Sequence, residues 1–193
     1  MTSQLRIIAA SLLLAASLLS ASANASDNNA RAMNVVSQLL SEAHSAISTG
    51  GPRDLSATIS PYFAFDLWGR FLIHPRRELF TVGQRRRFMR LLPGYMAHLY
   101  YAQFSKGMKL APSVGNARRV RRDVMVGSLF PRQSSGSLPV EWRLRKQKNG
   151  TVRIIDIMVG GTSFMLLKRD EFTAIVDRDG PNGLLAYLKR NSF

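Results

Sequence analysis

The chain has 193 residues and no cysteine, with 27 lysines and arginines against 12 aspartates and glutamates, a formal net charge of +15. Without cysteine there is neither a disulfide framework nor a thiol for lipid attachment, so the fold depends on its core alone. A surface this basic attracts anionic phosphates of any kind. Charge by itself therefore leaves phospholipid headgroups, nucleic acid and an acidic protein as possible partners.

The N-terminus predicts export. Arg6 is followed by the apolar run Ile7–Leu19 and then by small residues that end in Ala23-Asn24-Ala25. This order is typical of a secretory signal peptide, and the run is shorter than the roughly 20 residues of a membrane span. We predict that residues 1–25 are removed and that residues 26–193 form one domain, whose length is typical of a single unit. Export makes nucleic acid the least expected partner, and we predict none.

The first half of the mature chain has helical periodicity. Apolar residues recur at helical spacing over 32–47, and a second helical stretch runs from Leu55 to Leu72 with an interruption at Pro61. Thr81 and Gln84 have the spacing of a capping box, which opens a long helix. Pro93 removes a backbone donor from that helix. We expect a bend there and not an end, because the apolar stripe keeps its phase along Phe88, Leu91, Leu92, Tyr95, Leu99 and Ala102.

The second half changes to a strand period. Strands are predicted over 108–114, 124–130, 140–146 and 152–159, and Asn149-Gly150 marks a hairpin between the last two. Between residues 140 and 145 apolar side chains alternate with charged ones, so that strand has one buried face. Helices followed by an antiparallel meander predict an α+β domain, with a helical layer packed on a four-stranded antiparallel sheet.

Residues near the C-terminus carry a family resemblance. Their order resembles that of the MlaC-like periplasmic phospholipid-binding proteins, also called the toluene-tolerance family, and rests on Asp156, Gly161, Ser163, Arg169, Phe172, Gly180, Leu184 and Leu188. The segment Pro61–Asp66 and the pair Thr81 and Gln84 are also similar to family stretches. Two departures are Ala64, where the family often has Asp, and the segment Phe71–Pro75.

The resemblance implies a periplasmic carrier with an apolar cavity between helices and sheet. Such a carrier shuttles phospholipid between an inner-membrane ABC transporter complex and an outer-membrane lipid complex, and thereby maintains outer-membrane lipid asymmetry. Phospholipid is then cargo, and no cofactor is expected. We predict that lipid contacts come from the large apolar residues Phe63, Trp68, Phe71, Phe88, Leu91, Leu92, Tyr95, Leu99, Met125, Trp142, Leu144 and Ile157.

Three alternatives remain open on the sequence. The cargo is a hopanoid or another lipid, the chain is a basic adaptor without a cavity, or it is an enzyme of a related cone-shaped fold with Asp66 or Asp156 as base. We expect no enzyme, because Ser163 lies outside a Gly-x-Ser-x-Gly motif and no histidine follows residue 98 to activate it. Ser163 is instead expected to cap a helix. The histidine spacing matches no metal motif.

Overall fold

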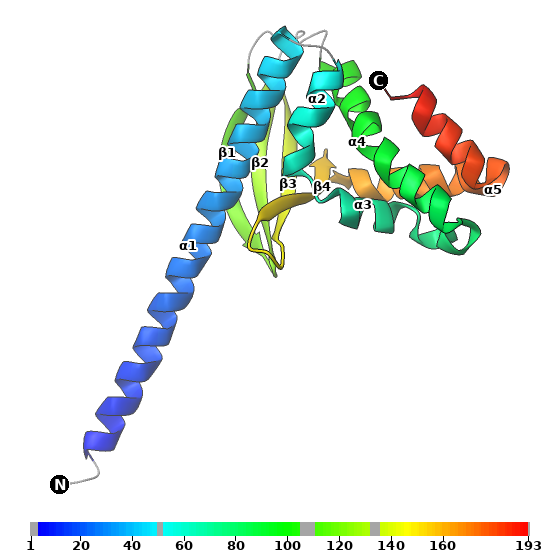
Figure 1. Cartoon of the computed structure of the whole chain (residues 1–193). Helices are drawn as coiled ribbons and strands as arrows, with labels where there is room; N and C mark the ends of the chain where they lie inside the picture. The colour runs from blue at the N-terminus through cyan, green and yellow to red at the C-terminus, as the bar shows by residue number, and fades with distance from the viewer. Residues whose placement is uncertain (1–3, 50–51, 105–110, 132–135, 193) are drawn as a thin grey trace.

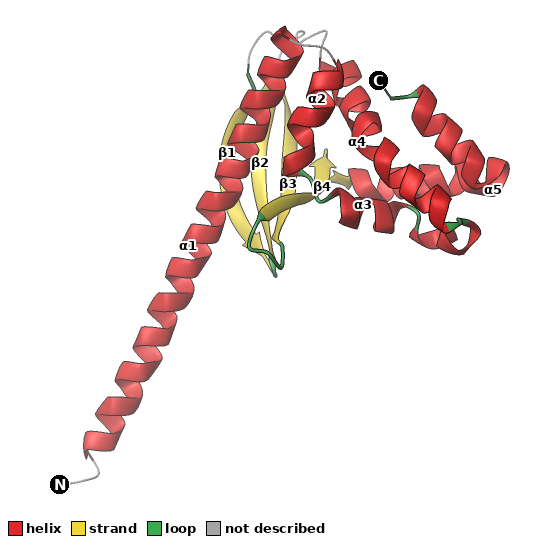
Figure 2. Ribbon diagram, in the orientation of Figure 1, coloured by secondary structure: helices red, strands yellow, loops and turns green. Residues whose placement is uncertain are grey.

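The structure is a computed structural model that describes residues 4–49, 52–104, 111–131 and 136–192. Side chains before residue 26, and those of Pro52, Gln103 and Phe104, lie outside this description. Helices and one antiparallel sheet form separate layers (Figures 1 and 2). The α+β prediction is confirmed.

The helices come mainly before the sheet. In chain order they are α1 (Gln4–Thr49), α2 (Pro52–Ile59), the short 3-10 helix η1 (Ser60–Tyr62), α3 (Phe65–Leu72), the 3-10 helix η2 (His74–Leu79) and α4 (Val82–Phe104). After the sheet, α5 (Phe164–Arg190) returns beside α3 and α4 (Figure 1). Helix α2 packs between α1 and α4, and α1 lies on the sheet.

The sheet is an antiparallel meander in the order β1-β2-β3-β4-β5. Its strands are β1 (Ser113–Val120), β2 (Asp123–Pro131), β3 (Ser137–Lys146), β4 (Val152–Val159) and β5 (Thr162–Ser163). The two-residue β5 is the addition to the four expected strands. It forms because Gly160 and Gly161, with φ of 58° and 79°, reverse the chain in two residues so that Val159 pairs with Thr162.

The first strand begins later than expected. Residues 108–110 of the strand predicted over 108–114 lie outside the described residues, and β1 covers Ser113–Val120. Strand β1 lies at the edge of the sheet and carries Arg118 and Arg119, whose charges are compatible with an exposed edge strand. The arginines of the run 118–122 hide the strand period in the sequence.

The predicted capping box is confirmed, and α4 does not end at Pro93. The Thr81 backbone N–H donates to Gln84 Oε1 at 2.9 Å, and the Gln84 N–H donates to Thr81 Oγ1 at 3.2 Å. Helix α4 continues through Pro93. In α5 the backbone leaves helical geometry at Gly180, where φ is 68° and ψ is −179°, so the Gly-Pro-Asn-Gly segment separates two helical parts.

Two hydrogen bonds to β4 fix α3 on the sheet. The β3–β4 register shifts between Arg143 and Leu144, which is a bulge. On β4 beside it, the Ile154 carbonyl accepts from the Ala64 N–H at 3.0 Å and from Trp68 Nε1 at 3.2 Å. These two bonds to β4 anchor the start of α3, where the fully buried Trp68 packs against Phe63 with ring centroids 5.2 Å apart.

Candidate functional site

An apolar cavity of about 420 Å³ lies between the sheet and the helices. Helices α1, α2, α4 and α5 contribute side chains to it, as do Phe63, which follows η1, and strands β2, β3 and β4. Its volume falls in the range of ordinary ligand sites. The lining residues are Leu39, Ile59, Phe63, Met96, Leu99, Tyr100, Phe130, Leu138, Val140, Trp142, Ile157, Val159 and Phe164.

Strand alternation aims the sheet residues into the cavity. Trp142 pairs with Ile157 and Val140 with Val159, so alternate residues of β3 and β4 share the helix-facing side. Glu141 and Met158, which are paired between them, point to the other side. The predicted alternation of β3 is confirmed, because its apolar residues are buried and its charged residues are only partly covered.

The cavity wall is uncharged in its described residues. The Trp142 indole Nε1 donates to Ser128 Oγ at 2.8 Å, and Ser128 in turn donates to the Val140 carbonyl at 3.2 Å. The buried indole is therefore satisfied without a ligand. Burial raises the pKa of Tyr100, which keeps its phenol neutral at physiological pH. A wall of this kind suits an apolar molecule, since a buried charge would find no partner there.

The cavity meets solvent at the end of the sheet where β2 connects to β3. Val159, at the end of β4, is 39% exposed, and Leu138, at the start of β3, is partly exposed. Deeper lining residues, such as Trp142 and Phe63, are buried. The opening is therefore at the opposite end of the sheet from the β1–β2 and β3–β4 turns.

Four predicted lipid contacts line this cavity, namely Phe63, Leu99, Trp142 and Ile157. The other predicted residues lie elsewhere. Trp68, Phe88, Leu92, Tyr95 and Leu144 are fully buried in the protein core, and Leu91 packs at its margin. Met125 pairs with Arg143 on the outer side of the sheet. Phe71 is 37% exposed, with the Arg169 guanidinium 5.1 Å from its ring centre.

Sequence reasoning missed much of the lining. Phe130, Leu138, Val140 and Val159 could have been found by extending the alternation of each strand to its end. Met96 and Tyr100 lie beyond Pro93, and α4 contributes only residues beyond Pro93 to the cavity. Phe88 and Leu92, before that proline, face α5 and the core instead. No signal in the sequence marks Leu39, Ile59 and Phe164 as lining residues.

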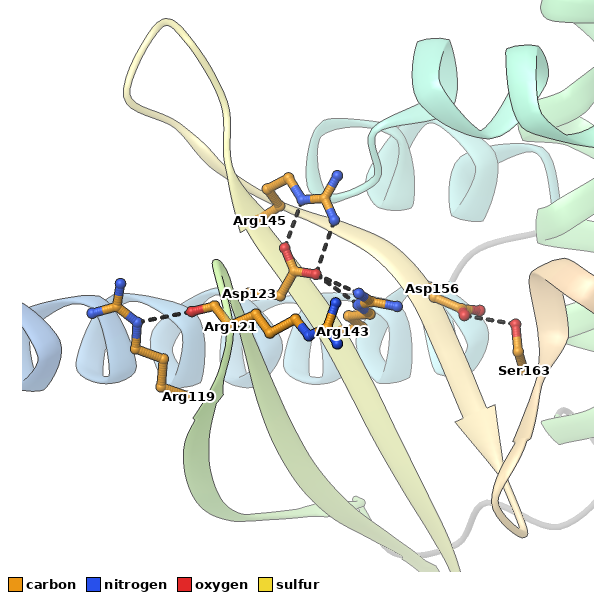
Figure 3. A network of polar contacts seen from close by, with 7 residues as sticks. All are labelled: Arg119, Arg121, Asp123, Arg143, Arg145, Asp156 and Ser163. Carbon is orange, nitrogen blue, oxygen red and sulfur yellow. Dashed lines mark hydrogen bonds and ion pairs between the residues drawn. The ribbon is translucent and has the colours of Figure 1, made fainter.

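A polar network occupies the outer face of the sheet (Figure 3). Asp123 is 1% exposed and accepts from Arg145 Nε at 2.6 Å and from Arg143 Nε at 2.7 Å. Burial alone would raise the pKa of Asp123, but the hydrogen bonds from Arg145 and Arg143 outweigh it and hold this pKa below its ordinary value. The network binds β2 to β3 and stays ionised at neutral pH.

Asp156, a candidate base, has a structural role in this geometry. Its carboxylate accepts from Ser163 Oγ at 2.6 Å, from the Ile157 N–H at 2.8 Å and from the Met165 N–H at 3.2 Å. Ser163 caps α5 by accepting from the Leu166 N–H at 3.1 Å, as predicted. Asp156 thus joins β4 to α5, and the other candidate, Asp66, is exposed and paired with Arg70.

Two searches over the described part of the chain bear on other site types. No group of three or more histidines, aspartates and glutamates there is placed to hold a metal ion. No helix among the same residues combines the length and apolar character needed to cross a membrane.

The fold and the cavity define a class of α+β domain with an apolar space between its sheet and its helices. The sequence model of the MlaC protein family matches residues 27–190. The chain belongs to the MlaC family, and the resemblance seen in the sequence is confirmed.

A solved structure supports the fold. It is the phospholipid-binding protein from Ralstonia solanacearum in complex with a phospholipid, to which the chain is similar with a TM-score of 0.68 and 16% identity. The similarity covers 85% of this chain and 96% of that one. A search of curated protein sequences gives no match.

Proposed function

We propose that this protein is a phospholipid carrier that holds acyl chains in the cavity between its sheet and helices. The observation that carries the proposal is the enclosed, uncharged wall of a cavity of about 420 Å³ in a chain of the MlaC family. A phospholipid-binding protein of similar fold supports the same cargo class. Binding of this kind needs no catalytic group.

The size of the cavity sets how the lipid fits. If a methylene takes about the volume of a water molecule, about 30 Å³, the cavity holds roughly fourteen methylenes, close to one acyl chain. Burial of that chain contributes roughly 11 kcal/mol before the costs of binding. A second chain requires the helices to separate from the sheet, or it lies along the opening near Val159 and Leu138.

The proposed route follows from family membership and the N-terminus. Residues 1–25 act as a signal peptide, and the carrier works in the periplasm between an inner-membrane ABC transporter complex and an outer-membrane lipid complex. This transport contributes to outer-membrane lipid asymmetry and to solvent tolerance. The apolar wall supports such transfer because it shields acyl chains from water.

The alternatives differ in what they require of the cavity. A hopanoid or another lipid would use the same apolar wall, so the cargo class has to be measured. A basic adaptor has no use for the cavity, and its presence favours the carrier. The enzyme hypothesis lacks a free base, because Asp156 is engaged by three donors and Asp66 pairs with Arg70.

Native mass spectrometry of protein purified from cells tests the proposal. We expect an adduct with the mass of a phospholipid, and lipid extraction followed by fragmentation should identify its headgroup and chains. A hopanoid mass would change the cargo while keeping the carrier. Protein that is folded and free of any lipid adduct would contradict the carrier and favour the adaptor.

A further inference from the structure

Two turns at one end of the sheet form a basic surface. The β1–β2 turn at Arg121 and Arg122 and the β3–β4 connection at residues 147–151 lie together, because both adjoin the same end of β2 and β3. We call this surface the cationic tip. It comprises Arg119, Arg121, Arg122, Lys146, Lys148 and Arg153, all exposed except the half-buried Arg153.

The charges of the tip are not neutralised within the described residues. The nearby carboxylate, Asp123, is taken by Arg143 and Arg145, which lie next to the tip (Figure 3). No residue of the tip has an ion-pair partner in the described part of the chain. Arg119 Nε donates instead to the Arg121 carbonyl at 3.0 Å, which holds the turn in shape. The tip therefore keeps a concentrated positive field.

The turn holds an arginine where the backbone disfavours it. Arg121 has φ of 56°, and it is the one non-glycine residue with positive φ among those described. Glycine or asparagine would adopt this conformation at lower cost. Strain of this kind points to a use for the side chain it displays, and here that side chain is a guanidinium at the apex of the turn.

No large apolar side chain among the described residues is exposed at the turns that form the tip. The large exposed apolar residues among those described are Phe71, Leu79, Val82, Leu129, Val159, Leu166 and Leu167, and none belongs to the tip. Protein interfaces usually centre on buried apolar or aromatic anchors, whereas a charged bilayer attracts basic side chains through its field alone. These observations favour an anionic membrane surface over a protein partner.

The geometry points to a docking mode in which the cationic tip binds the surface of an anionic bilayer and the cavity opens away from it. The N-terminal part of α1 leaves the domain past the same end of the sheet (Figure 1), and Asn28 of α1 lies beside Arg119 and Lys146. If the apolar segment 7–19 of the precursor lies at the membrane, the end of the sheet that carries the cationic tip faces that membrane. The proposal is independent of what the cavity holds.

Vesicle binding tests the tip against a matched control. The tip variant combines Arg121→Asn, Arg122→Gln and Lys146→Gln, and the control combines Arg86→Gln, Arg87→Gln and Arg90→Gln on α4, with the same loss of charge. The affinity for vesicles of 30% phosphatidylglycerol in phosphatidylcholine is measured by co-sedimentation at low salt. Each tip charge is expected to raise this affinity about fivefold. We therefore expect the vesicle affinity to fall roughly 100-fold in the tip variant and less than tenfold in the control.

Equal losses in the two variants would show that net charge, not the tip, attracts the protein, and would overturn the proposal. Absence of binding by the parent protein would also overturn it and would favour an acidic protein as the partner of the tip. Thermal unfolding of both variants checks that they are folded. Binding that weakens as salt rises is expected, since exposed charges are screened.

Orientation on the vesicle gives a second readout. The chain has no cysteine, so a fluorophore on Asn149→Cys reports from the tip and one on Ser137→Cys reports from the end where the cavity opens. Headgroup spin-labelled lipid should quench the first label strongly and leave the second nearly unchanged. Equal quenching, or quenching of the second label alone, would contradict the docking mode.

Discussion

At the scale of single residues, Asp123 shows how a buried charge stabilises one end of the sheet. It is covered by the strands, and two arginines that are themselves partly exposed supply its hydrogen bonds. A carboxylate in this position is costly without partners and stabilising with them. Because the folded state lowers the pKa of Asp123, its contribution to stability depends on pH.

Asp123→Asn should lower the free energy of unfolding by about 2–3 kcal/mol at pH 7, since it removes charge-assisted hydrogen bonds. A carboxylate whose pKa is lowered on folding stabilises the fold above its unfolded pKa, and this contribution fades as pH falls through the folded pKa. The difference between parent and variant should therefore shrink below about pH 4. Urea unfolding of both proteins at pH 7 and in acid measures this difference in the free energy of unfolding. A constant difference across this range would show that ionisation is not its cause.

At the scale of elements, the junction between β4 and α5 depends on one hydroxyl. Ser163 caps α5 and also donates to Asp156 on β4. Ser163→Ala should lower the free energy of unfolding by about 1–2 kcal/mol, through loss of the cap and of the buried bond. Thr162→Ala, at the exposed neighbouring position, should change it by less than about 0.5 kcal/mol. Urea unfolding measures both, and equal effects would argue against the cap.

Helix α4 is divided by Pro93 into two parts with different roles. Phe88 and Leu92 before it pack into the core, as does Tyr95 just beyond it, whereas Met96, Leu99 and Tyr100 further along line the cavity. The missing backbone donor weakens the helix at this boundary. If the lipid leaves by movement of the cavity half of α4, Pro93 is where the movement is permitted.

Pro93→Ala should raise the free energy of unfolding by about 1 kcal/mol and slow the release of bound lipid to acceptor vesicles several-fold. Gly83→Ala is the control. It strengthens the first turn of α4, where an added Cβ meets little, and it lies away from Pro93. A fluorescent phospholipid reports the rate. If the Pro93→Ala variant releases lipid at the parent rate, opening of the cavity does not depend on the weak point of α4 at Pro93.

At the scale of the whole molecule, the sequence predicted the layers better than the site. Period, capping box and hairpin signals are local, so they yielded the helices, the antiparallel meander and the cap at Ser163. The cavity, in contrast, is formed by residues that lie far apart in the sequence, so no local signal marks it. Trp68 and Phe88 are as large and apolar as Phe63 and Trp142, and only packing separates core from wall.

The edge of the sheet shows the same limit. The arginines at 118–122 belong to β1 and its turn, and four arginines in five residues hide the strand period from the sequence. These arginines do not surround the cavity, which opens at the other end of the sheet. The topology of the sheet, and not the residue types, determines that these arginines and the cavity opening lie at opposite ends.

The most direct test of a lipid-filled cavity places one bulky residue on each face of β4. Val159→Trp would fill the cavity from its partly exposed wall, and Met158→Trp would add the same side chain on the outer face. With native mass spectrometry of each purified protein, we predict that Val159→Trp is folded and loses at least about tenfold in lipid occupancy, while Met158→Trp matches the parent. Full occupancy in folded Val159→Trp, or equal loss in both, would contradict the assignment of this cavity as the lipid site.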